Sequence, residues 1–195
     1  MSYSSNYLDQ VYKGIKNASI TDKNGTELGL DKGLEMWTEK AERVRMEYDG
    51  LIFFCGNGAS ATMAEHMSHD WFQNAKINTT TCSETAHITA ISNDIGYDSV
   101  FSYRAERILS DKDLLVGISS SGNSVNILNA IEAAKKKGTF TIGLSGKNAD
   151  NGMRSIVDLS FYVPLNTYSE VESAHALILH MALDSYLDRY RGGRH

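Results

Sequence analysis

The chain has 195 residues, a formal net charge of −5 and a hydrophobic fraction of 42%, which indicates one globular domain with a sizeable core. The acidic balance argues against nucleic-acid binding through bulk electrostatics. Two cysteines, Cys55 and Cys82, are too few for a disulfide framework and favour a reducing compartment. No signal peptide opens the chain and no apolar stretch approaches the roughly 18 residues of a membrane span, so we expect a cytoplasmic protein without a membrane role.

The first part of the chain, up to about residue 48, is predicted to be helical. Apolar residues recur at helical spacing in two stretches. Between them, the stretch 21–33 contains three glycines and is predicted to be a loop. The apolar positions are Leu8, Val11, Tyr12 and Ile15 in the first stretch, and Leu34, Trp37, Ala41, Val44 and Tyr48 in the second.

Strand-like and helix-like patterns alternate over the rest of the chain. We expect strands at 51–55, 114–118, 140–144 and 159–163, with a weaker strand at 77–81. Helical patterns at 60–73, 124–137 and 169–190 separate them. Such alternation is typical of a parallel sheet covered by helices on both faces. The sequence therefore predicts a single domain over residues 1–195, an α/β fold with a doubly wound parallel sheet behind N-terminal helices.

Four serines follow the apolar run 114–118 and precede a helical pattern. They are Ser119, Ser120, Ser121 and Ser124. The N-terminus of a helix offers unpaired N–H groups and the positive end of its dipole, and serine hydroxyls add further donors. Ordinary helix capping needs only one serine. The cluster favours a phosphate-binding cradle over simple capping.

A glycine-rich turn follows the first strand, with the sequence Gly-Asn-Gly-Ala-Ser-Ala from Gly56. It fits a relaxed dinucleotide-binding pattern, but tight strand-to-helix turns favour glycine in any case. A dinucleotide site also needs an acidic residue after the second strand, where Glu84 is the one nearby candidate and follows a poor strand. Two phosphate-friendly turns are better explained by a small phosphorylated ligand.

These motifs, in this order, resemble the sugar isomerase (SIS) domain family. The matching segments are 54–60, Ser92-Asn93-Asp94, 117–124 and Gly143-Leu144-Ser145-Gly146. Within that family the chain is similar to the phosphoheptose isomerases, which convert sedoheptulose 7-phosphate to D-glycero-D-manno-heptose 7-phosphate. The likeness runs from about residue 51 to the C-terminus. It implies a flavodoxin-like sheet, a phosphorylated sugar as substrate and a homotetramer.

The resemblance also implies a set of substrate-binding positions. In that family the corresponding loop binds the phosphate of the sugar, so the four serines named above are expected to bind it here. It further places part of the glycine-rich turn and two residues of the Ser-Asn-Asp segment along the sugar. These positions are Asn57, Gly58, Ala59, Asn93 and Asp94.

Aldose–ketose isomerisation through an enediol needs a base, an acid and a group that polarises the carbonyl. His66 and Asp70 lie four residues apart on one predicted helix face, a usual spacing for two ligands of one metal ion, although a lone histidine on a helix is more often packed or solvated. The resemblance adds Glu172 and His180 to His66 and Asp70 as metal ligands, with zinc the expected ion. It makes Asp70 and His180 the catalytic pair and brings Glu172 near the substrate.

Two of these positions depart from the family pattern. The family has a longer glutamate where this chain has Asp70, and a neutral glutamine where it has Glu172. The first change draws the proposed base back by one methylene, and the second adds a negative charge beside the metal. Glu65 and His69 lie on other faces of the same predicted helix, and we expect them either behind the residues that contact the ligand or at the surface.

Glu172 and His180 are eight residues apart, about 12 Å along an unbroken helix, too far for one ion to reach both with ease. Either Glu172 lies on a frayed first turn, or another subunit completes the site. The apolar N-terminal helices could form such an assembly, or could simply cover this chain's own sheet.

Two classes of function remain open at this point. The enzyme interpretation depends on the ionisable residues His66, Asp70, Glu172 and His180 near the cradle. The alternative is a non-catalytic SIS-domain protein, a phosphosugar-binding regulator or a partner protein. Such proteins share the fold and the loops but tend to lose acid/base positions, so the four residues favour the enzyme.

Overall fold

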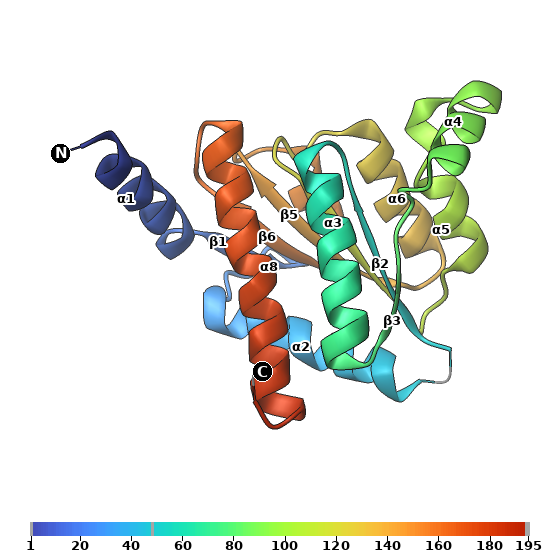
Figure 1. Ribbon diagram of the computed structural model, residues 1–195, viewed down its shortest axis with the longest axis horizontal. Helices are drawn as coiled ribbons and strands as arrows, with labels where there is room; N and C mark the ends of the chain where they lie inside the picture. The colour runs from blue at the N-terminus through green and yellow to red at the C-terminus, as the bar shows by residue number, and fades with distance from the viewer. Residues whose placement is uncertain (1, 48, 194–195) are drawn as a thin grey trace.

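The computed structural model describes residues 2–47 and 49–193 of the chain (Figure 1). These residues form a six-stranded sheet in the order β1-β6-β5-β4-β2-β3. The strands are β1 (Ser19–Asp22), β2 (Leu51–Gly56), β3 (Asn78–Thr80), β4 (Leu114–Ser119), β5 (Phe140–Gly146) and β6 (Leu159–Val163). The pairs from β6 to β3 are all parallel, as the sequence predicts.

The first strand, β1, corrects the sequence analysis. It pairs antiparallel with β6 at the edge of the sheet and includes Thr21 and Asp22, which were predicted to start a loop. A strand of four residues is too short to give a reliable alternating pattern. It is fixed instead by tertiary contacts, since Ile20 is fully buried and its N–H donates to the Glu27 carboxylate at 2.8 Å.

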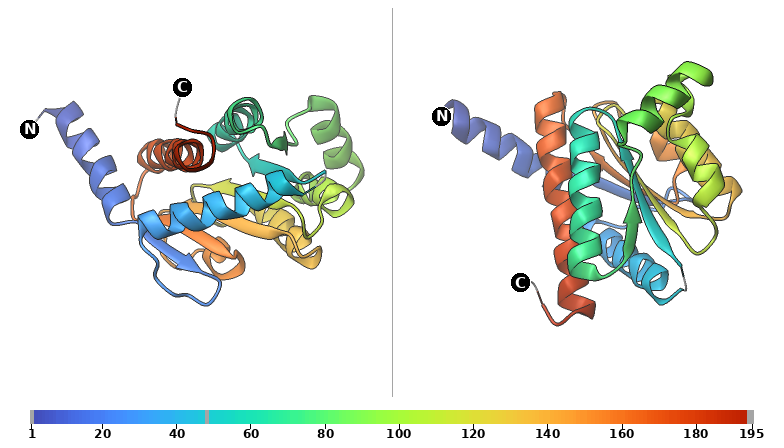
Figure 2. Two further views of the ribbon diagram at one scale, coloured as in Figure 1. Left: turned by 90° about the horizontal axis from the view of Figure 1, so that it is seen from below. Right: turned by 45° about the vertical axis from the view of Figure 1, so that its right-hand side comes forward.

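Helices cover both faces of the sheet (Figures 1 and 2). One face carries α2 (Leu30–Met46), α3 (Ala59–Asp70) and α8 (Tyr168–Tyr190). The other carries α4 (Thr85–Asp94), α5 (Ser102–Ile108), α6 (Val125–Lys136) and α7 (Gly152–Ile156). The sheet divides the core between them, because strand side chains alternate: Phe54 of β2 joins the first cluster and Phe53 the second.

Some helices were missed or bounded differently by the sequence patterns. No element was predicted between residues 82 and 113, where the structure has α4, α5 and a short 3₁₀ turn, η2 (Tyr97–Ser99). The pattern at 60–73 continues past α3 into a π-helical turn, η1 (Trp71–Ala75). Tyr48, which the helical pattern near the N-terminus included, lies outside the described residues.

The N-terminal helix α1 (Tyr3–Lys16) projects from the body of the molecule (Figure 2). Its main contact with the other elements is with α8. The Tyr7 hydroxyl lies 3.0 Å from the Ser173 hydroxyl of α8. A capping box of Thr167 and Glu170 starts α8, which continues for 23 residues. Among the described residues, none of the helices is long and apolar enough to cross a membrane.

Candidate active site

The strand order changes direction between β2 and β4. Without the edge strand β1, the five parallel strands follow the flavodoxin-like order 2-1-3-4-5 when numbered from β2. The helix after β2, α3, lies on one face of the sheet, and the helix after β4, α6, lies on the other. Ligands of such folds bind where the two connections diverge. The glycine-rich turn after β2 and the serine loop, residues Ser119–Ser124, flank this position.

The serine loop is organised by its own hydroxyls. Ser119 Oγ lies 3.0 Å from Ser124 Oγ and 3.5 Å from Ser121 Oγ, and it accepts the N–H of Gly122 at 3.2 Å. Gly122 has a φ of +65°, and a Cβ atom there would overlap the side chain of Asn151. The hydroxyls of three of the four predicted phosphate-binding serines thus lie together at the N-terminus of the 12-residue helix α6, where an anion is favoured. Ser120 is buried beneath them.

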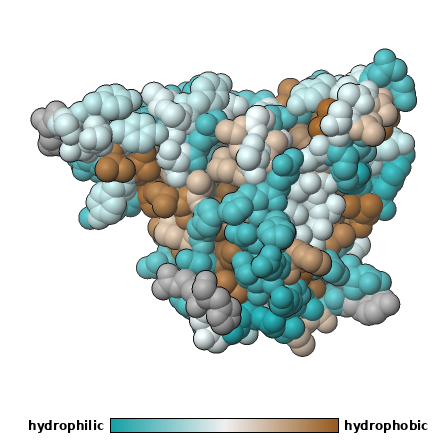
Figure 3. All heavy atoms as spheres, in the orientation of Figure 1, coloured by the Kyte–Doolittle hydropathy of each residue, from teal (hydrophilic) through white to brown (hydrophobic). Residues whose placement is uncertain are grey.

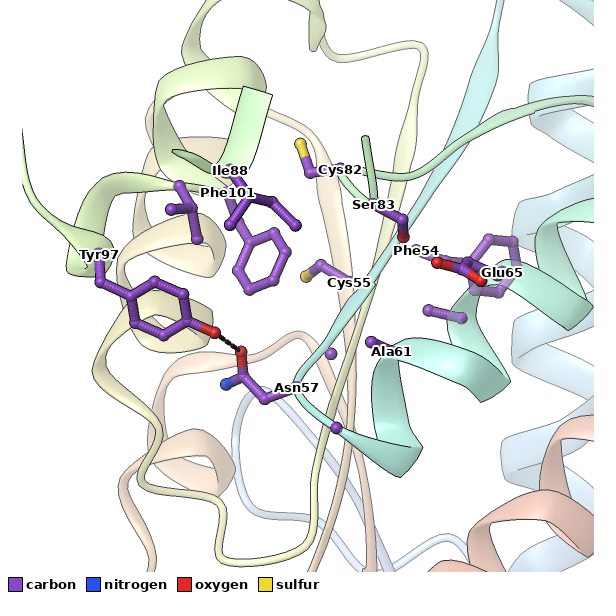
Figure 4. Close-up of a pocket in the computed structure, with 14 residues that line it drawn as sticks. Phe54, Cys55, Asn57, Ala61, Glu65, Cys82, Ser83, Ile88, Tyr97 and Phe101 are labelled. Atoms are coloured by element: carbon purple, nitrogen blue, oxygen red, sulfur yellow. Dashed lines mark hydrogen bonds between the residues drawn. The ribbon is translucent and has the colours of Figure 1, made fainter. Parts of the chain in front are cut away.

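The glycine-rich turn is tied to the same helix by a pair of amides. Asn57 and Asn126 exchange two hydrogen bonds of 2.9 and 3.0 Å through their side chains. The Tyr97 hydroxyl donates to the Asn57 oxygen at 2.9 Å (Figure 4). Gly58 has a φ of +57°, which favours glycine, and leads into Ala59, the first residue of α3. The two phosphate-friendly turns are therefore neighbours, as the sequence predicts.

A cavity of about 180 Å³ opens beside this turn, between α3 and α4 (Figure 4). Glu65, Ser83 and Tyr97 contribute polar groups to it, and Cys55 and Cys82 line it as free, buried thiols. Burial raises the pKa of the Cys55 thiol well above its usual range and that of Cys82 to about 12, so both stay protonated. Glu65 is exposed, as the sequence analysis expects, and it also lines this cavity, four residues after Ala61 on α3.

Three predicted metal ligands meet on the other side of α3. His66 Nε2 lies 3.1 Å from His180 Nε2 and 3.3 Å from Asp70 Oδ2. One ligand atom from each residue lies within 4.8 Å of the other two. His180 Nδ1 lies 2.7 Å from the Ala176 carbonyl and must donate to it, which leaves Nε2 free to face the other two residues. We call His66, Asp70 and His180 the metal group.

The donor set of the metal group fits a divalent ion. Two imidazole nitrogens and one carboxylate oxygen are ligands that zinc takes in catalytic sites, with further positions left for water or substrate. The fixed tautomer of His180 is the kind of outer hydrogen bond that orients a ligating imidazole. His66 is exposed over 52% of its side chain and Asp70 over 21%, so an ion could reach them from solvent.

The remaining predicted residues lie apart from the metal group. Glu172 stands two turns before His180 within α8, after an intact capping box, so its turn is not frayed. Asn93 and Asp94 are exposed at the end of α4, where the Asn93 amide donates to the Asp94 carboxylate at 2.9 Å. His69 is exposed on α3. Within the described residues, the metal group and the cavity therefore occupy different faces of α3.

Comparisons with known proteins identify the family of the chain. The SIS domain family matches residues 41–146. A phosphoheptose isomerase of Helicobacter pylori (strain P12) is 35% identical over 178 residues, 87% of this chain and 92% of the relative. One of Aliarcobacter butzleri is 36% identical over 151 residues, 73% of this chain and 79% of the relative.

Solved structures extend the comparison to the whole fold. The phosphoheptose isomerase GmhA of Neisseria gonorrhoeae superposes with a TM-score of 0.79 at 26% identity, covering 94% of this chain and 95% of that one. The Vibrio vulnificus NanR protein complexed with ManNAc-6P superposes with a TM-score of 0.67, covering 97% of this chain and 62% of its own. At 18% identity, the second comparison shows a shared fold alone.

Proposed function

The chain belongs to the SIS domain family and, within it, to the phosphoheptose isomerases, and we propose that it converts sedoheptulose 7-phosphate to D-glycero-D-manno-heptose 7-phosphate. The relatives at about 35% identity span most of both chains. The observation that carries the proposal is the pairing of an anion cradle with acid/base residues in one chain. A sugar phosphate needs the first for binding and the second for isomerisation.

The serine loop is the proposed binding site for the phosphate. Its hydroxyls and the N-terminus of α6 point donors at one place, and hydrogen bonds to an ionised phosphate are stronger than neutral ones. The hydrogen-bonded amides of Asn57 and Asn126 join this loop to the start of α3. The sugar would leave the cradle past Asn57, Gly58 and Ala59, with Asn93 and Asp94 as further partners.

The length of α3 supports a long sugar. Ala59, at the start of this helix beside the cradle, and Thr62 and His66 further along it are exposed and follow each other at helical spacing. From Ala59 to His66 the helix rises by about 10 Å. An extended chain of six or seven carbons with a terminal phosphate spans that distance, whereas a triose phosphate does not. We propose that the reacting carbons reach the metal group in this way.

We propose that the metal group holds one zinc ion through His66, Asp70 and His180. A bound zinc ion would polarise the carbonyl oxygen of the sugar as a Lewis acid. Asp70 is the proposed base, since a carboxylate has a second oxygen that can accept the proton from the carbon next to the carbonyl. That proton returns to the neighbouring carbon, and the hydroxyl proton of the first carbon is replaced by a proton on the former carbonyl oxygen, which completes the isomerisation through an enediol.

His180 has one free nitrogen for two predicted roles. Because Nδ1 donates to Ala176, Nε2 cannot ligate an ion and donate a proton at the same moment. We propose that Nε2 is a ligand when zinc is present, and that in the absence of zinc the doubly protonated ring donates its Nε2 proton to the carbonyl oxygen. The metal-free protein should then retain part of its activity.

A second copy of the chain is the proposed cover for this open site. An apolar groove of about 830 Å³ runs between α1 and α8, and His180 lies at its border. Brown, hydrophobic spheres gather there beneath α1 (Figure 3). Leu8, Tyr12 and Leu177 expose half or more of their surface in it, and neighbouring exposed apolar side chains can mark a contact between proteins. We propose a homotetramer in which Glu172 of another copy approaches the metal group.

Two further expectations stay proposals. We propose that residues 1–195 act as a single SIS domain with a helical N-terminal region of about 48 residues, because the main core cluster includes residues from α1 to α8. We also propose a cytoplasmic location, because both cysteines are free and buried rather than paired. A non-catalytic protein that binds a phosphosugar is the second candidate, because a protein with the same fold, Vibrio vulnificus NanR, was solved in complex with ManNAc-6P.

An assay of ketose phosphates with five, six and seven carbons tests the proposed function. We expect aldose formation from sedoheptulose 7-phosphate and a much lower rate with the five-carbon sugar. Each substrate should be measured with protein stripped of metal and with protein reloaded with zinc. Tight binding of the sugar without any turnover would instead favour the regulator.

A further inference from the structure

A fully buried histidine on α8 connects this helix to the sheet. His175 has no exposed surface, and its Nε2 lies 3.1 Å from the carbonyl oxygen of Ser145 at the end of β5. The carbonyl can only accept, so Nε2 carries the proton. The other ring nitrogen, Nδ1, is buried without a hydrogen-bond partner among the described residues.

The strand end that His175 contacts also supports the serine loop. Ser145 is paired with Ser119 across β4 and β5. The next residue, Gly146, donates its N–H to the carbonyl of Ser120 at 3.1 Å. A Cβ atom on Gly146 would come within 2.6 Å of the Val171 side chain on α8, so this side chain packs directly against the backbone of the strand end. His175 is therefore two hydrogen bonds away from the serine loop.

We propose that His175 is a positioning residue that sets the distance between the serine loop and the metal group. It lies five residues before His180 on an unbroken helix, so a shift of α8 against β5 moves His180 relative to the phosphate cradle. This inference rests on the proposed function, in which one substrate contacts both places. A misplacement of about 1 Å between two parts of a site can lower a rate by a hundredfold.

The choice of histidine supports a role beyond packing. A leucine would fill the same buried volume without leaving a nitrogen unpaired, and buried polar groups without partners are rare enough to need an explanation. Burial also lowers the pKa of His175 to about 4, which keeps the ring neutral near pH 7. The neutral ring then holds one fixed direction, from α8 to the Ser145 carbonyl.

Two substitutions separate the hydrogen bond from the packing. His175→Leu removes the donor, whereas His175→Gln keeps an N–H donor near the position of Nε2. We expect kcat/KM for sedoheptulose 7-phosphate to fall by about tenfold to a hundredfold in the leucine variant and to recover largely in the glutamine variant. The inhibition constant for inorganic phosphate and the zinc content should stay within about twofold of the wild-type values, because the serine loop and the metal group each remain intact.

Leu187→Ala is the matched control, since Leu187 is buried near the end of α8 and belongs neither to the serine loop nor to the metal group. It should lower the melting temperature without lowering kcat/KM. Hydrogen exchange at the Gly146 amide supplies a readout that does not depend on activity, and it should be faster in His175→Leu only.

Wild-type kcat/KM and unchanged Gly146 exchange in His175→Leu would overturn the inference, and so would a glutamine variant no better than the leucine variant. A wild-type protein without isomerase activity would refute the proposed function instead, while Gly146 exchange would still test the link.

Discussion

The Nε2 atoms of His66 and His180 lie 3.1 Å apart, although the two residues are separated by 114 positions in the chain. Their rings are tilted by 45° rather than stacked. His180 is held in this direction by Ala176, and Asp70 approaches His66 from one turn further along α3. Two helices thus bring three potential ligand atoms together at an exposed place, where hydrophobic packing does not require it.

Loss of the metal group should remove one ion per chain. We expect protein purified without chelator to contain about one zinc per chain by elemental analysis, and His66→Asn to contain far less, because mixed imidazole and carboxylate ligands suit this ion. His69→Asn is the matched control, since His69 lies on the same helix and is exposed but is not part of the group. Equal zinc in both variants would rule out His66 as a ligand.

Removal of hydroxyls from the serine loop should weaken binding of the substrate. Ser119→Ala combined with Ser121→Ala should raise KM by about a hundredfold or more, since each of the two lost hydrogen bonds to a charged group contributes about 1.5–3 kcal/mol. Ser155→Ala removes an exposed serine of α7 that donates to the Gly152 carbonyl, and it should leave KM unchanged. A double variant with the KM of the wild-type protein would show that the phosphate binds elsewhere.

The sequence was sufficient for the elements that bury apolar surface in a regular pattern. The strand at 159–163 has the predicted bounds, and the strands near 51, 114 and 140 are each longer by one or two residues at their ends. The elements that the sequence patterns missed are stabilised by contacts with residues distant in the chain. The strand β1 forms because β6 offers it an edge, and α4 and α5 form on the second core cluster without a strong pattern of their own.

The candidate site was predictable to a similar extent. Spacing alone suggested that His66 and Asp70 share a face, because both lie on one helix. The approach of His180 from α8 was assigned by resemblance, since no local pattern relates two helices more than a hundred residues apart. Glu65 is exposed, as expected, but its place beside the cavity could not be predicted, because the segment from Ser83 to Phe101 that closes the cavity is distant in sequence.

Acidification should destabilise the wild-type protein through His175. The folded pKa of about 4 lies below the usual 6.5, so the unfolded chain binds more protons between these pH values, and the free energy of unfolding falls as the pH falls through that window. The contribution is about 3 kcal/mol over the whole window. Urea unfolding at a series of pH values should show a smaller decrease for His175→Gln, which has no ring to protonate. If the free energy of unfolding depended on pH in the same way in both proteins, the lowered pKa of His175 would be contradicted.

A charge in the apolar groove should break the assembly. Leu8→Asp would bury a carboxylate in the proposed contact between copies, which is costly without a partner, so sedimentation should show a shift from tetramer towards smaller species. Met46→Asp changes an equally exposed apolar residue at the end of α2 and should leave the assembly intact. A wild-type protein that sediments as a monomer would refute the tetramer and the proposed approach of Glu172.

Transfer of solvent deuterium tests the central claim most directly. When sedoheptulose 7-phosphate is converted in D₂O by zinc-loaded protein, NMR should show deuterium at the carbon next to the carbonyl, because an enediol intermediate exchanges its proton. Asp70→Asn should slow both label uptake and turnover by about a hundredfold or more, whereas Asp70→Glu, which restores the family's side chain, should retain both. Turnover without any solvent label, or undiminished turnover in Asp70→Asn, would contradict the proposed enediol mechanism with Asp70 as its base.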